Sequence, residues 1–143
     1  MTHITASLDI AAPPEAVWKV LVDWGSYPEW NPTIRAIAGQ ARKGAKITVS
    51  VASPVGTLAI PAVVTQFTVN SGITWHSKMQ MSGLFDRDHI IEIAPDPVGT
   101  RITQTQTFAG ILAPGASVVA TRTVRDGLAK MNAALKERVE ARG

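Results

Sequence analysis

The sequence predicts an α+β fold in which a curved, seven-stranded antiparallel sheet surrounds one long C-terminal helix, in the order strand, two helices, six strands, helix. Short segments between Ile34 and Phe108 alternate apolar and polar residues, as half-buried strands do. Helical segments separate them from a first strand near the N-terminus. After them, apolar residues recur at steps of three and four up to about Glu140, which is typical of an amphipathic helix.

The first elements follow from local signals. Residues 4–10 place apolar side chains at alternate positions and predict a strand. Pro13 and Pro14 favour a helix start, because the first helical turn leaves backbone N–H groups unpaired and proline has none to lose. Breakers on both sides limit residues 26–30 to one short helical turn. The first helix presents an apolar face made of Val17, Val20, Leu21 and Trp24.

Alternation also predicts the remaining strands. Residues 46–52 carry apolar side chains on one face and polar ones on the other, and form a hairpin with the preceding strand. Pro61 has no backbone N–H for a sheet ladder, so it predicts an edge position or a bulge. The second to seventh strands are expected at residues 34–39, 46–52, 58–69, 73–81, 85–94 and 101–108.

The closing helix is expected to open at Ala113-Pro114-Gly115 and to run to about Glu140. Gly127 lies within it, where glycine costs about 1 kcal/mol relative to alanine. Two explanations remain open: close contact with the sheet, or room for a ligand. The apolar stripe of the helix is Val118, Thr121, Val124, Leu128, Met131, Leu135 and Val139.

Composition indicates one domain spanning residues 1–143. The chain has no cysteine, which excludes disulfides, thiol catalysis and cysteine–zinc sites. The net charge is +3 with scattered basic residues, so no nucleic-acid surface is expected. No signal peptide and no transmembrane segment is visible, and a cytoplasmic monomer or homodimer is predicted.

Several segments resemble a known superfamily. Residues 11–18 (AAPPEAVW) are similar to the opening of its bacterial members, and residues 27–32 (YPEWNP) are similar to their next segment. Residues 99–101 (GTR), 108–112 (FAGIL) and 131–136 (MNAALK) also resemble that group. The chain is thus identified as a member of the START-like (SRPBCC) superfamily, close to the polyketide cyclase/dehydrase-like bacterial proteins.

This resemblance covers essentially the whole chain and implies the helix-grip fold, also called START-like or Bet v 1-like. It further implies a deep cavity between the curved sheet and the final helix. Members bind very different molecules, so the resemblance is specific for fold and weak for function. No catalytic set of the family's enzymes maps onto these residues.

His89 is the best candidate for chemistry. It shares a strand face with Arg87 and Ile91, because side chains alternate with period two. A histidine among apolar neighbours needs a hydrogen-bond partner, which Gln104 or Gln106 on the next strand could supply. Such a polar group would suit an oxygenated hydrophobic ligand. It could equally be a structural network that orients the strands.

Other candidates are mainly apolar. Trp30 could close one end of the cavity or act as a hydrophobic staple, with Asn31 capping backbone groups. The segments near Gly83 and Gly110 could form a lid or ordinary turns. The expected apolar lining of the site comprises Trp75, Met79, Met81, Phe85, Phe108, Val124, Leu128 and Met131.

A metal centre is not expected. Asp86 and Asp88 fall on one face of their strand and His89 on the other, so two exposed aspartates near a turn are the better explanation. No cofactor motif is present. Three functions remain open: a binding protein for a lipid, polyketide or other aromatic, a cyclase/dehydrase-type enzyme with His89 as general acid or base, and a protein interaction module.

Overall fold

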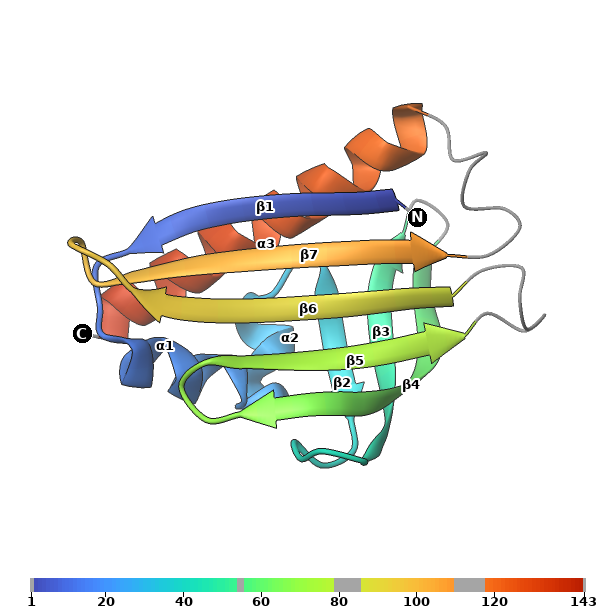
Figure 1. The fold of residues 1–143 in the computed structure, drawn as a ribbon, viewed down its shortest axis with the longest axis horizontal. Helices are drawn as coiled ribbons and strands as arrows, with labels where there is room; N and C mark the ends of the chain where they lie inside the picture. The colour runs from blue at the N-terminus through green and yellow to red at the C-terminus, as the bar shows by residue number, and fades with distance from the viewer. Residues whose placement is uncertain (1, 54–55, 79–85, 110–117, 143) are drawn as a thin grey trace.

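The computed structural model describes residues 2–53, 56–78, 86–109 and 118–142. Strands and helices follow one another in the predicted order (Figure 1). The elements are β1 (Thr2–Ile10), α1 (Pro14–Leu21), the 3₁₀ helix η1 (Trp24–Ser26), α2 (Tyr27–Trp30), β2 (Ile34–Ala38), β3 (Lys46–Ser53), β4 (Gly56–Thr68), β5 (Gly72–Lys78), β6 (Asp86–Pro95), β7 (Thr100–Ala109) and α3 (Val118–Arg142).

The seven strands form one sheet in the order β1-β7-β6-β5-β4-β3-β2, with antiparallel neighbours throughout. This confirms the predicted sheet, and β1 and β2 are its two edges. The sheet is curved, and α3 lies across one of its faces together with the shorter helices (Figure 1). The predicted continuation of the fifth strand to Met81, the start of the sixth at Phe85 and the opening of the helix at Ala113 lie outside the described residues.

Pro61 corrects one expectation. It lies in β4, which β3 and β5 flank, so the predicted edge position is wrong. The register shift in β4 falls between Val64 and Gln66 rather than at the proline. Pro61 pairs with Thr48 of β3, and the described pairing with β5 begins one residue later. The proline nitrogen therefore lies before the described pairing with β5, where no described β5 residue is its partner.

Side chains near the short helices bind backbone groups of neighbouring segments. Pro14 lies in the first turn of α1, as predicted. The Asn31 side chain caps the start of β2, because its Oδ1 accepts hydrogen bonds from the N–H groups of Thr33 (2.9 Å) and Ile34 (2.8 Å). The buried Tyr27 hydroxyl donates to the carbonyl of Leu21 at 2.5 Å, which holds α2 against α1.

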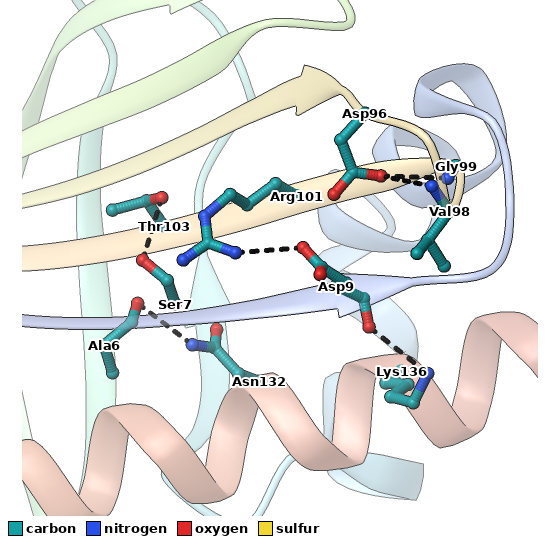
Figure 2. A network of polar contacts seen from close by, with 10 residues as sticks. All are labelled: Ala6, Ser7, Asp9, Asp96, Val98, Gly99, Arg101, Thr103, Asn132 and Lys136. Atoms are coloured by element: carbon teal, nitrogen blue, oxygen red, sulfur yellow. Dashed lines mark hydrogen bonds and ion pairs between the residues drawn. The ribbon is translucent and has the colours of Figure 1, made fainter.

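Helix α3 covers the free edge of β1. Asn132 Nδ2 donates to the Ala6 carbonyl (3.1 Å), and Lys136 Nζ donates to the Asp9 carbonyl (3.2 Å; Figure 2). One turn later, Glu140 Oε2 accepts from the N–H of Ala11 at 2.9 Å. These side chains take up backbone groups that an edge strand would otherwise leave unpaired.

On its other side α3 touches the segment that enters β2. The Thr33 hydroxyl donates to the Gly127 carbonyl at 2.7 Å, and Arg138 pairs with Glu29 at 2.9 Å. A Cβ at position 127 would lie 3.4 Å from the Thr33 methyl group. That is an ordinary van der Waals distance, so the close contact with the sheet expected of Gly127 is not observed, and its neighbour is the loop before β2.

The inner face of the sheet, meaning the face toward α3, is filled unevenly. Near α1 its residues are almost fully covered: Ile10, Ile73, Ile91 and Ile102 are 0–2% exposed. Toward the end where β5 stops and β6 begins, Phe108 on this face is 6% exposed, but Arg87 and Gln106 are only half-buried. Leu58 pairs with Val51 on this face and remains 49% exposed. The core is therefore closed at one end and incompletely covered at the other.

Candidate functional site

A chain of buried hydrogen bonds crosses from the sheet to α3. His89 Nε2 on β6 lies 2.8 Å from Gln104 Oε1 on β7. Gln104 Nε2 donates to Asn132 Oδ1 on α3 at 2.7 Å, and Asn132 Nδ2 donates to the Ala6 carbonyl on β1. The three side chains are 5%, 0% and 1% exposed. We call His89, Gln104 and Asn132 together the polar line. With the Ala6 carbonyl it joins β6, β7 and β1 to α3 inside the fold.

The Ala6 carbonyl at the end of the polar line determines which group donates in each of its hydrogen bonds. A backbone carbonyl only accepts, so Asn132 must turn its NH₂ toward Ala6 and its oxygen toward Gln104. Gln104 then presents its own oxygen to His89, which requires the proton on Nε2. The neutral imidazole of His89 consequently keeps Nδ1 as a bare acceptor, and no residue in the described ranges donates a hydrogen bond to it.

The surroundings keep His89 neutral. Burial is the main cause that lowers its pKa from 6.5 to about 4, and the nearby positive charge of Arg87 lowers it further, while the hydrogen bond to Gln104 opposes both. The Trp75 ring packs on the imidazole, with 4.8 Å between ring centroids. At neutral pH the site therefore presents an uncharged imidazole against an aromatic wall.

Arg87 and Gln106 extend the polar patch along the inner face. Arg87 lies two residues before His89 on β6, and Gln106 is the direct partner of His89 across β7. Both side chains are half-buried. Within the described residues Gln106 Oε1 is buried without a hydrogen-bond partner, so the predicted inclusion of Gln106 in the polar line is not observed. Burial also lowers the pKa of the Arg87 guanidinium.

The polar line runs between two apolar clusters. The main core lies on one side and includes Trp75, Ile91 and Met131. A smaller cluster lies on the other side, where Leu128 and the half-buried Val124 of α3 pack near Phe108 of β7. The sequence prediction placed these six residues around one site, and they lie on the inner face or on the helix face that covers it. Met79, Met81, Phe85 and the segments near Gly83 and Gly110 lie outside the described residues.

Trp30 does not lie near the polar line, although it was expected among the site residues. It lies on α2, where its ring packs edge-to-face on Tyr27 with centroids 5.0 Å apart. It also lines a shallow outer groove with Ala134 and Arg138 from the C-terminal half of α3. The indole therefore lies against the main core and away from the polar line.

Asn132 was missed as a site residue by the sequence analysis. It lies four positions after Leu128 and next to Met131, so it falls on the apolar stripe of the helix. A polar side chain at a predicted core position signals a buried hydrogen-bond partner. That signal was present in the sequence, since the helical period alone places Asn132 toward the sheet.

A histidine–aspartate pair lies on the outer face of the sheet. His76 Nδ1 lies 2.6 Å from Asp88 Oδ1, across the β5–β6 register. Asp88 is therefore paired rather than simply exposed, and strand alternation separates it from His89, as predicted. Within the described residues, no three His, Asp or Glu side chains gather as a metal site would require.

Two further surface features bear on function. A groove of about 740 Å³ lies between the segment before α1 and the last turns of α3, with Ala16 and Val139 among its lining residues. It is open to solvent and flanked by Glu15 and Lys19. None of the helices in the described ranges is both long and apolar enough to cross a membrane.

The comparisons with known proteins agree with this architecture. Residues 1–140 match the family model described as "Polyketide cyclase / dehydrase and lipid transport". None of the curated proteins matches the sequence.

Several solved structures share the fold. TTHA0849 from Thermus thermophilus is 16% identical, with a TM-score of 0.79 over 99% of both chains. A START superfamily protein from Mycobacterium smegmatis is 19% identical, with a TM-score of 0.76 over 99% of both chains. Ara h 8.0201 is 14% identical, with a TM-score of 0.75 over 98% of both chains. The fold is thus START-like and Bet v 1-like, and the chain belongs to the polyketide cyclase/dehydrase and lipid transport family.

Proposed function

We propose that the protein binds a hydrophobic small molecule, such as a lipid, a polyketide or another aromatic, between the inner face of the sheet and the N-terminal half of α3. The observation that carries the proposal is the uneven filling of the inner face. Apolar side chains such as Leu58 face inward yet stay 49% exposed, beside a buried polar line. Sites for small molecules combine such apolar walls with a few fixed polar groups.

The polar line gives this site its orientation. His89 Nε2 and Gln104 use their hydrogen-bonding groups within the protein, so the imidazole is held rigidly. Its free acceptor Nδ1 is then available at a fixed position for a donor on the ligand. Rigid placement of this kind lowers the entropic cost of binding.

The second candidate, a cyclase/dehydrase-type enzyme with His89 as general acid or base, receives less support. General acid–base catalysis is most effective when the pKa lies near the working pH. The pKa of His89 is about 4, so at neutral pH almost none of it is the imidazolium that a general acid requires, and the neutral ring is a weak base. The buried imidazole suits recognition better than proton transfer.

The direct test of binding is native mass spectrometry of freshly purified protein. We expect a population that carries a bound organic molecule. Val124→Trp, at a half-buried position on the covering helix, should remove that population by filling the space. Val98→Trp, at a position that is 54% exposed in the β6–β7 turn, is the matched control and should keep it. Equal spectra for both variants would contradict the proposal.

A further inference from the structure

Arg87 is a cation on the inner face without an anionic partner. No side-chain carboxylate pairs with it in the part of the chain that the structure describes, which contains all 11 Asp and Glu residues. The neighbouring acids Asp86 and Asp88 alternate onto the outer face, where Asp88 pairs with His76. Arg87 is half-buried, so water solvates its side chain only in part.

Two unused acceptors lie beside this cation. Among the residues that the structure describes, Gln106 Oε1 is buried without a hydrogen-bond partner, and the direction of the polar line leaves His89 Nδ1 without a donor. The strand register places Gln106 opposite His89, and Arg87 two residues further along the same face. The inner face therefore offers one cationic donor and two acceptors in a contiguous patch.

Ligand entry would change the solvation of this patch. An apolar molecule that displaced water from Arg87 would leave a charge without compensation, which is costly in a low-dielectric site. An anionic oxygen would replace that water with charge-assisted hydrogen bonds. The unpaired cation therefore selects against neutral ligands and favours acidic ones.

We propose that the site takes a hydrophobic carboxylate, whose anionic oxygen pairs with Arg87 and whose hydroxyl, where present, donates to His89 Nδ1 or Gln106 Oε1. This inference rests on the proposed function and adds the chemical class of the ligand. The apolar body would lie against the half-buried Val124 of the helix. The geometry assigns the charged end of the ligand to the incompletely covered end of the sheet.

Three probes that share one naphthalene ring system test this assignment. Binding of 2-naphthoate, its neutral methyl ester and 6-hydroxy-2-naphthoate is measured by calorimetry at neutral pH. We expect 2-naphthoate to bind about tenfold more tightly than the ester, since a charge-assisted hydrogen bond exceeds a neutral one by about that factor in affinity. The added hydroxyl should tighten binding further.

Variants locate the effect. Arg87→Gln should abolish the preference for the acid while ester binding stays within about twofold. Arg87→Lys keeps the charge and should retain most of the preference, which guards against an effect of misfolding. Arg122→Gln removes an exposed arginine of α3 and is the control for net charge, so it should leave the preference intact.

Each outcome decides a separate point. Equal binding of acid and ester to the wild type overturns the carboxylate inference but leaves hydrophobic binding in place. A preference that survives in Arg87→Gln, or that is lost equally in Arg122→Gln, overturns the role of Arg87. Absence of binding by all three probes contradicts both this inference and the proposed function.

Discussion

Asn132 on α3 donates its side-chain N–H to the backbone carbonyl of Ala6 on β1, at 3.1 Å. This single contact anchors the covering helix to the sheet edge and also sets the state of a histidine on another strand. Because the carbonyl only accepts, the orientation of Asn132 fixes Gln104, and Gln104 fixes the proton on His89 Nε2. Fold and site thus share one line of hydrogen bonds.

Replacing Asn132 should therefore cost stability. Asn132→Leu keeps the number of side-chain heavy atoms but leaves the Gln104 amide and the Ala6 carbonyl without these partners. Each buried group left unpaired costs about 1–3 kcal/mol, so we expect a loss of about 2–6 kcal/mol in the free energy of unfolding. Urea denaturation measures it. Ser7→Ala removes an exposed hydrogen bond to Thr103 from the same strand and should change stability by no more than about 0.5 kcal/mol.

The low pKa of His89 predicts a pH dependence of stability. In the unfolded chain His89 takes up a proton as the pH falls through 6.5, whereas in the folded protein it does so only near 4. The unfolded state therefore binds more protons between these values, and the folded protein loses stability as the pH falls across this window. The contribution is fully present above pH 6.5.

A variant isolates this term. His89→Gln can still donate to Gln104 but does not titrate. The stability advantage of the wild type over this variant should shrink by about 3 kcal/mol between neutral pH and pH 4. Chemical denaturation at a series of pH values measures the difference. A difference that stays constant with pH would show that His89 titrates normally in the fold.

The tautomer of His89 is a separate prediction. Nitrogen NMR of the imidazole should show a protonated Nε2 and an unprotonated Nδ1 at neutral pH. Asn132→Leu should broaden or shift these signals, because Gln104 then loses the contact that orients its amide. Finding the proton on Nδ1 would contradict the direction assigned to the polar line.

Tyr27 supports the closed end of the core. Its hydroxyl donates to the Leu21 carbonyl in a fully buried position. Tyr27→Phe leaves that carbonyl without this partner and should lower the free energy of unfolding by about 1–3 kcal/mol. Ser26 precedes Tyr27 in the chain. Ser26→Ala removes an exposed hydrogen bond to Asp23 and should have little effect. Similar losses in both variants would argue against a special role for burial here.

Much of the fold was predictable because alternation and helical period are local properties. They placed His89, Arg87 and Ile91 on one face of β6, and the same alternation brought Gln104 to the inner face of β7. The choice of Gln104 over Gln106 as the partner of His89 depends on a diagonal contact between strands. Local pattern alone does not distinguish these two residues.

Contacts between distant segments were beyond sequence reasoning. The His76–Asp88 pair depends on the β5–β6 register, and the Thr33–Gly127 bond joins residues 94 positions apart. The position of Pro61 inside the sheet depends on where the pairing with β5 begins. Asn132 is the exception, since its place on an apolar stripe was visible from the helical period.

The location of a bound molecule tests the central claim most directly. Intermolecular NOEs from 2-naphthoate protons to the labelled protein would show which surface it contacts. We predict NOEs to Val124 on α3 and to Phe108 on the inner face of β7. NOEs confined to Ala16 and Val139 in the outer groove, or to Ile90 on the outer face of the sheet, would contradict binding between the sheet and α3.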